Sequence, residues 1–299
     1  MAIWRSLLLC LVLFSTAVSA QPAHNLSVQI ETETRSPQPG GKATIAFAVT
    51  PKHGWHDYWI NPGDAGGPLT VEWSLPSGVT AGPLQFPVPT PLNIGGFMNH
   101  VYEAPHAIIA DLTVASSVPA GTKLPIAVKA MWFACSDRLC VPEEARFVVD
   151  LVAGDKATAS QPRFDAWRAA LPSPLDRSGR YMMSGKSFAL AVPFPRGATT
   201  GPVYFFPETK DIFRYAAAQT ARRSGDWLII ESEVERPAVG AIAGLLRIGE
   251  NRGLTVRATS GTIAKGGDQI AVVPSGGEGE AGQGTHALLL LLLGALLGG

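Results

Sequence analysis

Two cysteines within one short segment are the residues of this chain best suited to chemistry. Cys135 and Cys140 are separated by four residues in the run MWFACSDRLCVPEE, residues 131–144. In the chain-entropy model a disulfide that closes so short a loop stabilises a fold by only about 2 kcal/mol, against about 5 kcal/mol for a loop of a hundred residues. Ser136 and Asp137 favour a turn between the two cysteines. We therefore favour a redox-active pair over an inert bridge.

Charged side chains next to the pair bear on its reactivity, because the attacking species is a thiolate. Arg138 would stabilise a thiolate, whereas Asp137, Glu143 and Glu144 oppose one. The sequence leaves this balance open. A purely structural disulfide therefore stays as the alternative interpretation.

The N-terminal residues 1–20 have the pattern of a secretory signal peptide. Arg5 supplies the positive charge, residues 7–14 form a short apolar run, and residues 18–20 (VSA) are the small residues that a signal peptidase requires. Cys10 lies inside the apolar run and is removed with it. We therefore expect Cys135 and Cys140 to be exported to a compartment that permits disulfides.

The C-terminal residues predict a membrane attachment. Residues 274–286 form a linker rich in glycine and glutamate, and residues 287–299 are apolar. A helix that crosses a bilayer needs about 20 residues. We interpret residues 287–299 as the start of a transmembrane helix, in preference to a buried helix or an incomplete anchor, with the rest of the chain tethered to the inner membrane.

Composition and periodicity predict an all-β protein. The chain has 24 basic and 24 acidic residues, which argues against a nucleic-acid partner. Short alternating runs separated by proline and glycine predict two β-sandwich domains in tandem, residues 21–155 and 180–273, joined by a linker over residues 156–179 with a helix at residues 164–171. Residues 61–64 (NPGD) are typical of a turn. The expected strands cover residues 43–50, 69–75, 107–114, 124–133, 145–152, 188–192, 203–206, 227–233, 244–248 and 254–258.

Several motifs in order resemble one known family. They are GWHDYW and NPGD at residues 54–64, WSLPSGVTAGP at residues 73–83, the segment from Gly95 to Glu103, and CSDRLCVPEE at residues 135–144. This set resembles the immunoglobulin-like N-terminal periplasmic region of the thiol:disulfide interchange protein DsbD family. The spacing of four residues between the cysteines is that of its copper-suppressor (ScsB-like) branch, whereas the best-known members have five.

The resemblance implies a relay that carries electrons from cytoplasmic thioredoxin, through a transmembrane redox domain, to exported partners. The partners would be thioredoxin-fold disulfide isomerases or reductases, or cytochrome c maturation factors, at the periplasmic face of the bacterial inner membrane. The resemblance also implies that Cys140 forms the mixed disulfides and that Cys135 resolves them. It places Tyr58 near the site, and it implies a cap loop over residues 90–98 in which Ile94 or Phe97 shields the cysteines.

A second interpretation is a membrane-tethered β-sandwich that binds copper or a client protein and has an inert disulfide. Its candidate copper ligands are His53, His56, His100, His106 and Met98. No spacing typical of zinc ligands is present. For the redox interpretation we expect no metal ion or other cofactor.

Overall fold

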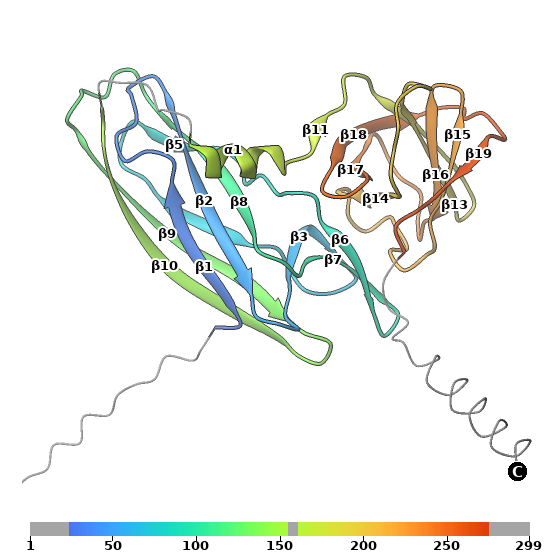
Figure 1. Cartoon of the computed structure of the whole chain (residues 1–299), viewed down its shortest axis with the longest axis horizontal. Coiled ribbons are helices and arrows are strands. Elements are labelled where there is room, and N and C mark those ends of the chain that lie inside the picture. Colours follow the sequence, from blue (N-terminus) through green and yellow to red (C-terminus); the bar gives the residue numbers. More distant parts are fainter. Residues whose placement is uncertain (1–23, 155–160, 275–299) are drawn as a thin grey trace, which may run out of the picture.

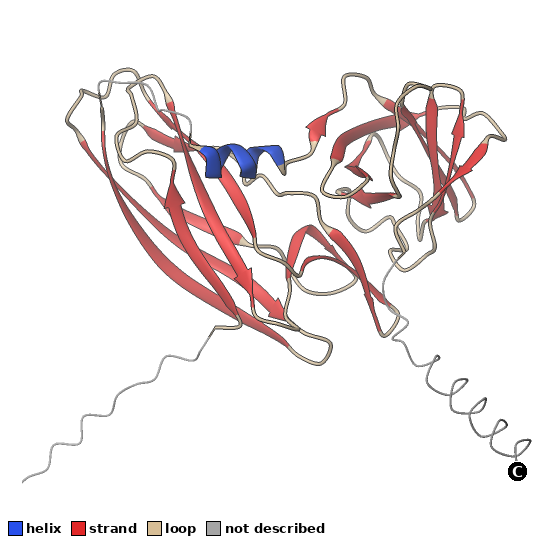
Figure 2. Ribbon diagram, viewed as in Figure 1, coloured by secondary structure: helices blue, strands red, loops and turns tan. Residues whose placement is uncertain are grey.

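The computed structural model describes residues 24–154, the first region, and residues 161–274, the second region (Figure 1). Within these ranges nineteen strands and one helix are present, so the expected all-β class is confirmed (Figure 2). The expected signal peptide and the apolar residues 287–299 lie outside the described residues. No helix in the described part of the chain is long and apolar enough to span a membrane.

Two sheets of the first region pack face to face. One has the strand order β1–β2–β8–β5 and the other the order β10–β9–β4, and all their pairings are antiparallel. Five of the predicted strands are confirmed here as β2, β4, β8, β9 and β10. The bounds are β1 Leu26–Thr32, β2 Lys42–Pro51, β4 Thr70–Ser74, β5 Val79–Ala81, β8 His106–Val114, β9 Lys123–Cys135 and β10 Cys140–Val152.

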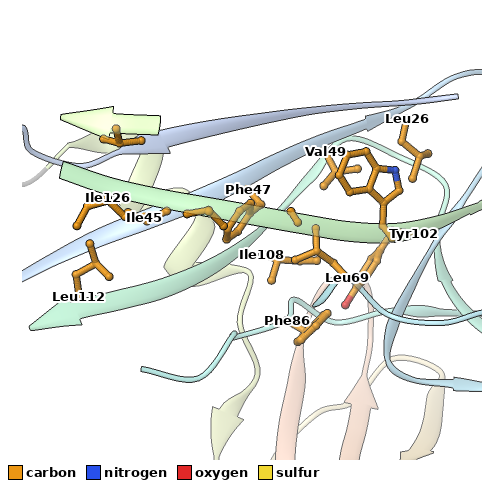
Figure 3. Packing of buried hydrophobic residues seen from close by; sticks show 14 of the residues in the cluster. Leu26, Ile45, Phe47, Val49, Leu69, Phe86, Tyr102, Ile108, Leu112 and Ile126 are labelled. Atoms are coloured by element: carbon orange, nitrogen blue, oxygen red, sulfur yellow. The ribbon is translucent and has the colours of Figure 1, made fainter. Parts of the chain in front are cut away.

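The core of the first region follows from the alternation of side chains along its strands. On β9, Ile126, Val128 and Trp132 are buried on one face because successive side chains of a strand point to opposite sides. They belong to the same hydrophobic cluster as Phe47 on β2 and Ile108 on β8, which lie in the opposite sheet (Figure 3). Each large apolar side chain buried in this way contributes roughly 1.5–3 kcal/mol.

A third sheet, which we did not predict as strands, has the order β3–β7–β6. Its strands are β3 Asp57–Gly63, β6 Thr90–Ile94 and β7 Phe97–Tyr102. Residues 61–63, interpreted above as a turn, instead belong to β3. The expected cap loop is a hairpin, because Gly95 and Gly96 both have positive φ, +60° and +90°, as a tight two-residue turn requires.

The second region forms one nine-stranded sheet. Its order is β14–β17–β18–β12–β13–β16–β15–β19, and β11 pairs with β18. An isolated bridge between Val203 and Val272 joins the two ends of this order, so the sheet closes on itself. This differs from the expected pair of antiparallel sheets, as do the parallel pairings of β18 with β11 and β12. The bounds are β11 Ser173–Pro174, β12 Gly179–Ser184, β13 Ser187–Pro193, β14 Val203–Pro207, β15 Thr220–Ser224, β16 Trp227–Glu233, β17 Ile242–Ile248, β18 Gly253–Ser260 and β19 Asp268–Ile270.

The predicted helix is confirmed as α1, Pro162–Ala169, at the start of the second region. Its Phe164 is buried against Ala46 and Ile109, on the face of the β1–β2–β8–β5 sheet that points away from the core. Arg168 forms a hydrogen-bonded ion pair with Glu33. The helix is therefore fixed to the first region while the chain continues into the second (Figure 1).

The third sheet also contacts the second region, and we call this contact the junction. Asn61 on β3 donates its side-chain N–H groups to the carbonyl oxygen of Pro207 at 2.7 Å and to the hydroxyl oxygen of Tyr215 at 3.0 Å. His100 on β7 lies edge-on to Phe206, with ring centroids 5.0 Å apart. The third sheet thus lies between the long strands β9 and β10 and the second region (Figure 1).

Candidate functional site

The β9–β10 hairpin brings the two cysteines together. Cys135 and Cys140 are direct cross-strand partners with Cα atoms 4.0 Å apart, and a disulfide joins them. The backbone of Cys135 exchanges both of its hydrogen bonds with His56, at 2.8 and 3.0 Å. Its pairing with Cys140 is therefore of the non-hydrogen-bonded type, in which opposing side chains of an antiparallel ladder come closest.

The loop between the cysteines is the expected turn. The backbone N–H of Ser136 donates to the carbonyl oxygen of Leu139 at 2.8 Å, which closes the loop. The hydroxyl oxygen of Ser136 accepts from the backbone N–H groups of Arg138 and Leu139 at 3.2 and 3.1 Å. The predicted turn is confirmed, and Ser136 is the residue that organises it.

The two cysteines differ sharply in exposure although both lie on the outer face of their sheet. Cys135 is only 2% exposed because Tyr58 on β3 and Val101 on β7 pack over it. Cys140 is exposed to solvent. A visiting protein can therefore contact Cys140 but not Cys135.

Tyr58, selected from the sequence, lies in the small buried cluster around Cys135. Gly66, with φ +77°, passes so close to the Tyr58 ring that a Cβ atom at this position would overlap the ring. Burial raises the pKa of the Tyr58 hydroxyl to about 12, with a smaller contribution from Asp57. The tyrosine is thus a neutral side chain held over the buried sulfur.

A histidine completes this cluster. His56 is buried, and its Nε2 atom lies 3.3 Å from the Tyr58 hydroxyl oxygen. Desolvation lowers the pKa of His56 to about 4, although the neighbouring Asp57 acts in the opposite direction. The carboxylate of Asp57 is itself paired with His106 at 3.1 Å. From the sequence we considered His56 only as a metal ligand. One residue separates it from Tyr58 in GWHDYW, and this strand spacing could have indicated that the two side chains lie on the same face.

The charged residues near the pair divide into two groups. Arg138 and Asp137 are exposed, lie 3.6 Å from each other, and both belong to the short loop that joins the two cysteines. Glu143 instead points into the core, where it accepts hydrogen bonds from the Trp132 indole N–H at 3.0 Å and the Asn25 backbone N–H at 2.6 Å. Glu144 also has a separate partner in Lys129. Of the three acids, Asp137 is therefore the one positioned to oppose a thiolate.

The two cap candidates lie at the β6–β7 turn. Ile94 is half-buried, and Phe97 is 59% exposed. Neither belongs to the cluster around Cys135, whereas Leu92 on the same hairpin packs against it. The hairpin therefore contributes to the cover of Cys135 through Leu92, and a shielding role for Ile94 or Phe97 stays a prediction.

The candidate copper ligands are dispersed. His53 is exposed in a turn, His100 is buried at the junction, and the Nε2 atom of His106 lies 3.1 Å from the Asp57 carboxylate. Over residues 24–154 and 161–274, no three histidine, cysteine or acidic side chains are grouped as a metal site.

Comparison with known proteins identifies the region that carries the cysteines. Residues 25–151 match the family described as thiol:disulfide interchange protein DsbD, N-terminal. These residues form a DsbD-family N-terminal domain. This family assignment supports a general role of the domain, which we call the DsbD-type domain, as a thiol–disulfide exchange module.

One solved structure agrees with this assignment at the level of the fold. The crystal structure of the N-terminal periplasmic domain of ScsB from Proteus mirabilis has a TM-score of 0.61 at 14% identity, and the match covers 81% of this chain and 95% of that chain. The Escherichia coli adhesin FdeC (TM-score 0.23, 12% identity, 79% and 66% coverage) and the E. coli chaperone DraB (0.24, 9%, 79% and 98%) are much less similar. No curated protein sequence matches this chain significantly.

Proposed function

We propose that the DsbD-type domain reduces disulfides of exported proteins through Cys140, with Cys135 as the resolving cysteine. The difference in exposure between the two sulfurs supports this assignment. In the reduced protein, the Cys140 thiolate attacks a partner disulfide and forms a mixed disulfide. Cys135 then attacks the sulfur of Cys140, which releases the partner as a dithiol and regenerates the Cys135–Cys140 bridge.

We further propose that the electrons come from a transmembrane redox domain, its own or associated, and ultimately from cytoplasmic thioredoxin. The acceptors would be periplasmic thioredoxin-fold proteins or cytochrome c maturation factors. The family assignment supports the periplasmic side of this scheme, and the four-residue spacing supports the ScsB-like, copper-suppressor branch. The apolar residues 287–299 would then be the point at which the chain enters the inner membrane.

The division of the chain into functional units is part of the same proposal. Residues 21–155 would be the redox domain, residues 156–179 a linker, and residues 180–273 a second domain that serves as a spacer or docking module. A separate hydrophobic cluster made only of second-region residues supports this division, although Tyr204, Phe206 and Leu245 of the second region pack into the cluster of the first. The junction supports a fixed placement of the second domain against the third sheet.

Trapping of the mixed disulfide tests the exchange function. In a Cys135→Ala variant, Cys140 can still attack the partner disulfide, but no second cysteine can resolve the mixed disulfide. We therefore expect a stable adduct with a thioredoxin-fold partner on non-reducing gels. Cys140→Ala is the matched control and should trap none. If neither variant forms an adduct, and the bridge stays closed in glutathione buffers that open exchange catalysts, the disulfide is structural and the module binds clients in another way.

A further inference from the structure

A buried histidine is the direct ladder partner of the buried cysteine. His56 and Cys135 exchange two backbone hydrogen bonds and form an antiparallel bridge. Residues paired in this way point to the same face of a sheet, where their side chains are neighbours. Both contact Tyr58: Cys135 packs against it, and His56 bonds to its hydroxyl. The three side chains therefore form one buried group.

In the resolving step, the thiol of Cys135 must lose its proton, and a nearby base would accept it. Cys135 attacks only as a thiolate, yet it is 2% exposed and lies among Val101, Leu92 and the ring of Tyr58. Apolar surroundings disfavour a thiolate, and solvent cannot take the proton directly at a site covered in this way. A base inside the cover removes this obstacle.

We propose that His56 is the base that accepts the thiol proton of Cys135 during the resolving step. This inference rests on the exchange function proposed above. The proton moves from the Cys135 sulfur to an imidazole nitrogen, and the thiolate electron pair forms the bond to the Cys140 sulfur. The bond between Cys140 and the partner sulfur breaks, the partner leaves as a thiolate, and imidazolium returns the proton to that thiolate or to solvent.

The protonation state of His56 suits this role. Desolvation lowers its pKa to about 4, so the imidazole is neutral at pH 7 and can accept a proton, and the same desolvation makes it a weaker base than a free imidazole until a charged partner forms. A thiolate formed beside it favours the imidazolium form, because an opposite charge at short range favours the charged state of both groups. The Tyr58 hydroxyl, whose pKa is raised to about 12, stays neutral and holds the ring in place.

The ionisable groups around His56 are few. Tyr58 and Asp57 lie on its own segment, and Cys135 lies across the ladder. Asp57 is paired with His106 on β8. The residues of the third sheet that pack over Cys135 from β6 and β7, Leu92 and Val101, are apolar.

Stopped-flow reaction of the reduced protein with dithiobis-nitrobenzoate tests the proposal, because each cysteine releases one coloured thiolate in turn. The first phase reports attack by Cys140 and the second reports resolution by Cys135. For His56→Gln we expect the second phase to slow by about 100-fold near pH 7, the usual size of a general-base contribution, with the first phase unchanged. His53→Gln, which changes an exposed histidine of the neighbouring turn, is the matched control and should leave both phases unchanged.

Two outcomes separate this inference from the function on which it rests. If the unaltered protein shows no second phase, the exchange function itself fails. If it shows both phases and His56→Gln resolves at the same rate over the whole pH range, only the role of His56 is overturned.

A measurement on the unaltered protein decides the case if His56→Gln does not fold. With an internal base, the rate of the second phase should stay high well below the ordinary cysteine pKa of about 8.5. A rate that follows a single ionisation near this value overturns the proposal.

Discussion

The first and second regions are both built from alternating strands, but they bury very different side chains. Among the described residues nine polar or charged side chains are buried, and eight of them lie in the first region; the second has only Arg222. Five of the eight lie on or next to the third sheet: His56, Asp57, Asn61, Asn99 and His100. Burying polar groups costs free energy unless they are bonded. Their concentration therefore distinguishes the third sheet from the largely apolar interior of the second region.

The two regions also differ in what covers the edges of their sheets. In the second region the sheet closes on itself, and its core is apolar. In the first region the ladder of β9 passes from β4 to the single bridge with His56, so the end of β9 is covered by another sheet. This arrangement lets the sulfur of Cys135 lie on an outer face and still be enclosed.

The largest expected effect is a loss of stability in the second region that leaves thiol exchange in the first region unchanged. Phe188 is fully buried in the core of the second region. We expect Phe188→Ala to lower the free energy of unfolding by about 3–5 kcal/mol, because it removes a large aromatic ring and leaves a cavity. Under conditions in which this variant is folded, exchange at Cys140 should keep its rate. Denaturant unfolding and thiol-release kinetics check this, and slower exchange in the folded variant would break the separation.

Low pH should destabilise the first region more than the second. Burial lowers the pKa of His100 from 6.5 to about 4, so the folded state binds its proton later than the unfolded state as the pH falls. The stabilisation is complete above about pH 6.5 and is lost as the pH falls toward 4; for His100 the loss is about 2 kcal/mol at pH 5. His56 acts in the same direction. The described part of the second region contains no histidine.

Urea unfolding at pH 7 and pH 5 measures this dependence, and His100→Gln should remove about half of it. Hydrogen exchange read strand by strand would localise the loss. An equal loss in β13 and β16 would contradict the assignment to the first region.

The junction should have an intermediate effect. Asn61→Ala leaves the buried carbonyl of Pro207 without its donor, and we expect a cost of about 1–3 kcal/mol. Tyr215→Phe removes only the second, longer contact and should cost less. Faster amide exchange in β3 and β14 would show that the two regions have loosened, and protection identical to that of the unaltered protein would argue against a bonded junction.

The smallest effect concerns the exposed loop charges. Arg138 and Asp137 are 88% and 72% exposed, so removing either should change stability by less than about 1 kcal/mol. Arg138→Gln should nevertheless raise the thiol pKa of Cys140 and Asp137→Asn should lower it, since cations favour and anions disfavour a thiolate. The pH dependence of alkylation of Cys140 measures both shifts. Shifts of the same sign, or shifts that do not shrink in high salt, would contradict this.

The strands that could be predicted from the sequence are those that form the two cores. Residues 124–133 alternate between buried and outward positions, whereas residues 107–110 are buried on both faces because α1 covers the outer one. Both runs appear as strands with nearly the expected bounds. The third sheet escaped prediction because its strands carry Asn61, Pro62 and Gly63, or Asn99 and His100, where an apolar alternation would be expected. Two of those residues have partners far away in the chain: Asn61 contacts Pro207 and Tyr215, and His100 contacts Phe206.

The site was predicted in part for the same reason. The spacing of the cysteines identified the pair and its turn, because both depend on local sequence. The burial of Cys135 depends on Tyr58, Val101 and Leu92, which reach it only through the third sheet. The inward direction of Glu143 likewise depends on the register of β10 with β9.

The third sheet has a mechanical consequence for the molecule. Tyr58 on β3 rests on the enclosed sulfur, and three residues later Asn61 is bonded to the second region. The strand β3 therefore contacts both the buried cysteine and the second region. A movement of the second region that keeps the Asn61 contacts must also shift the side chain of Tyr58, which covers Cys135. Force or binding applied to the second region would thus alter the surroundings of the cysteine pair without any direct contact with it.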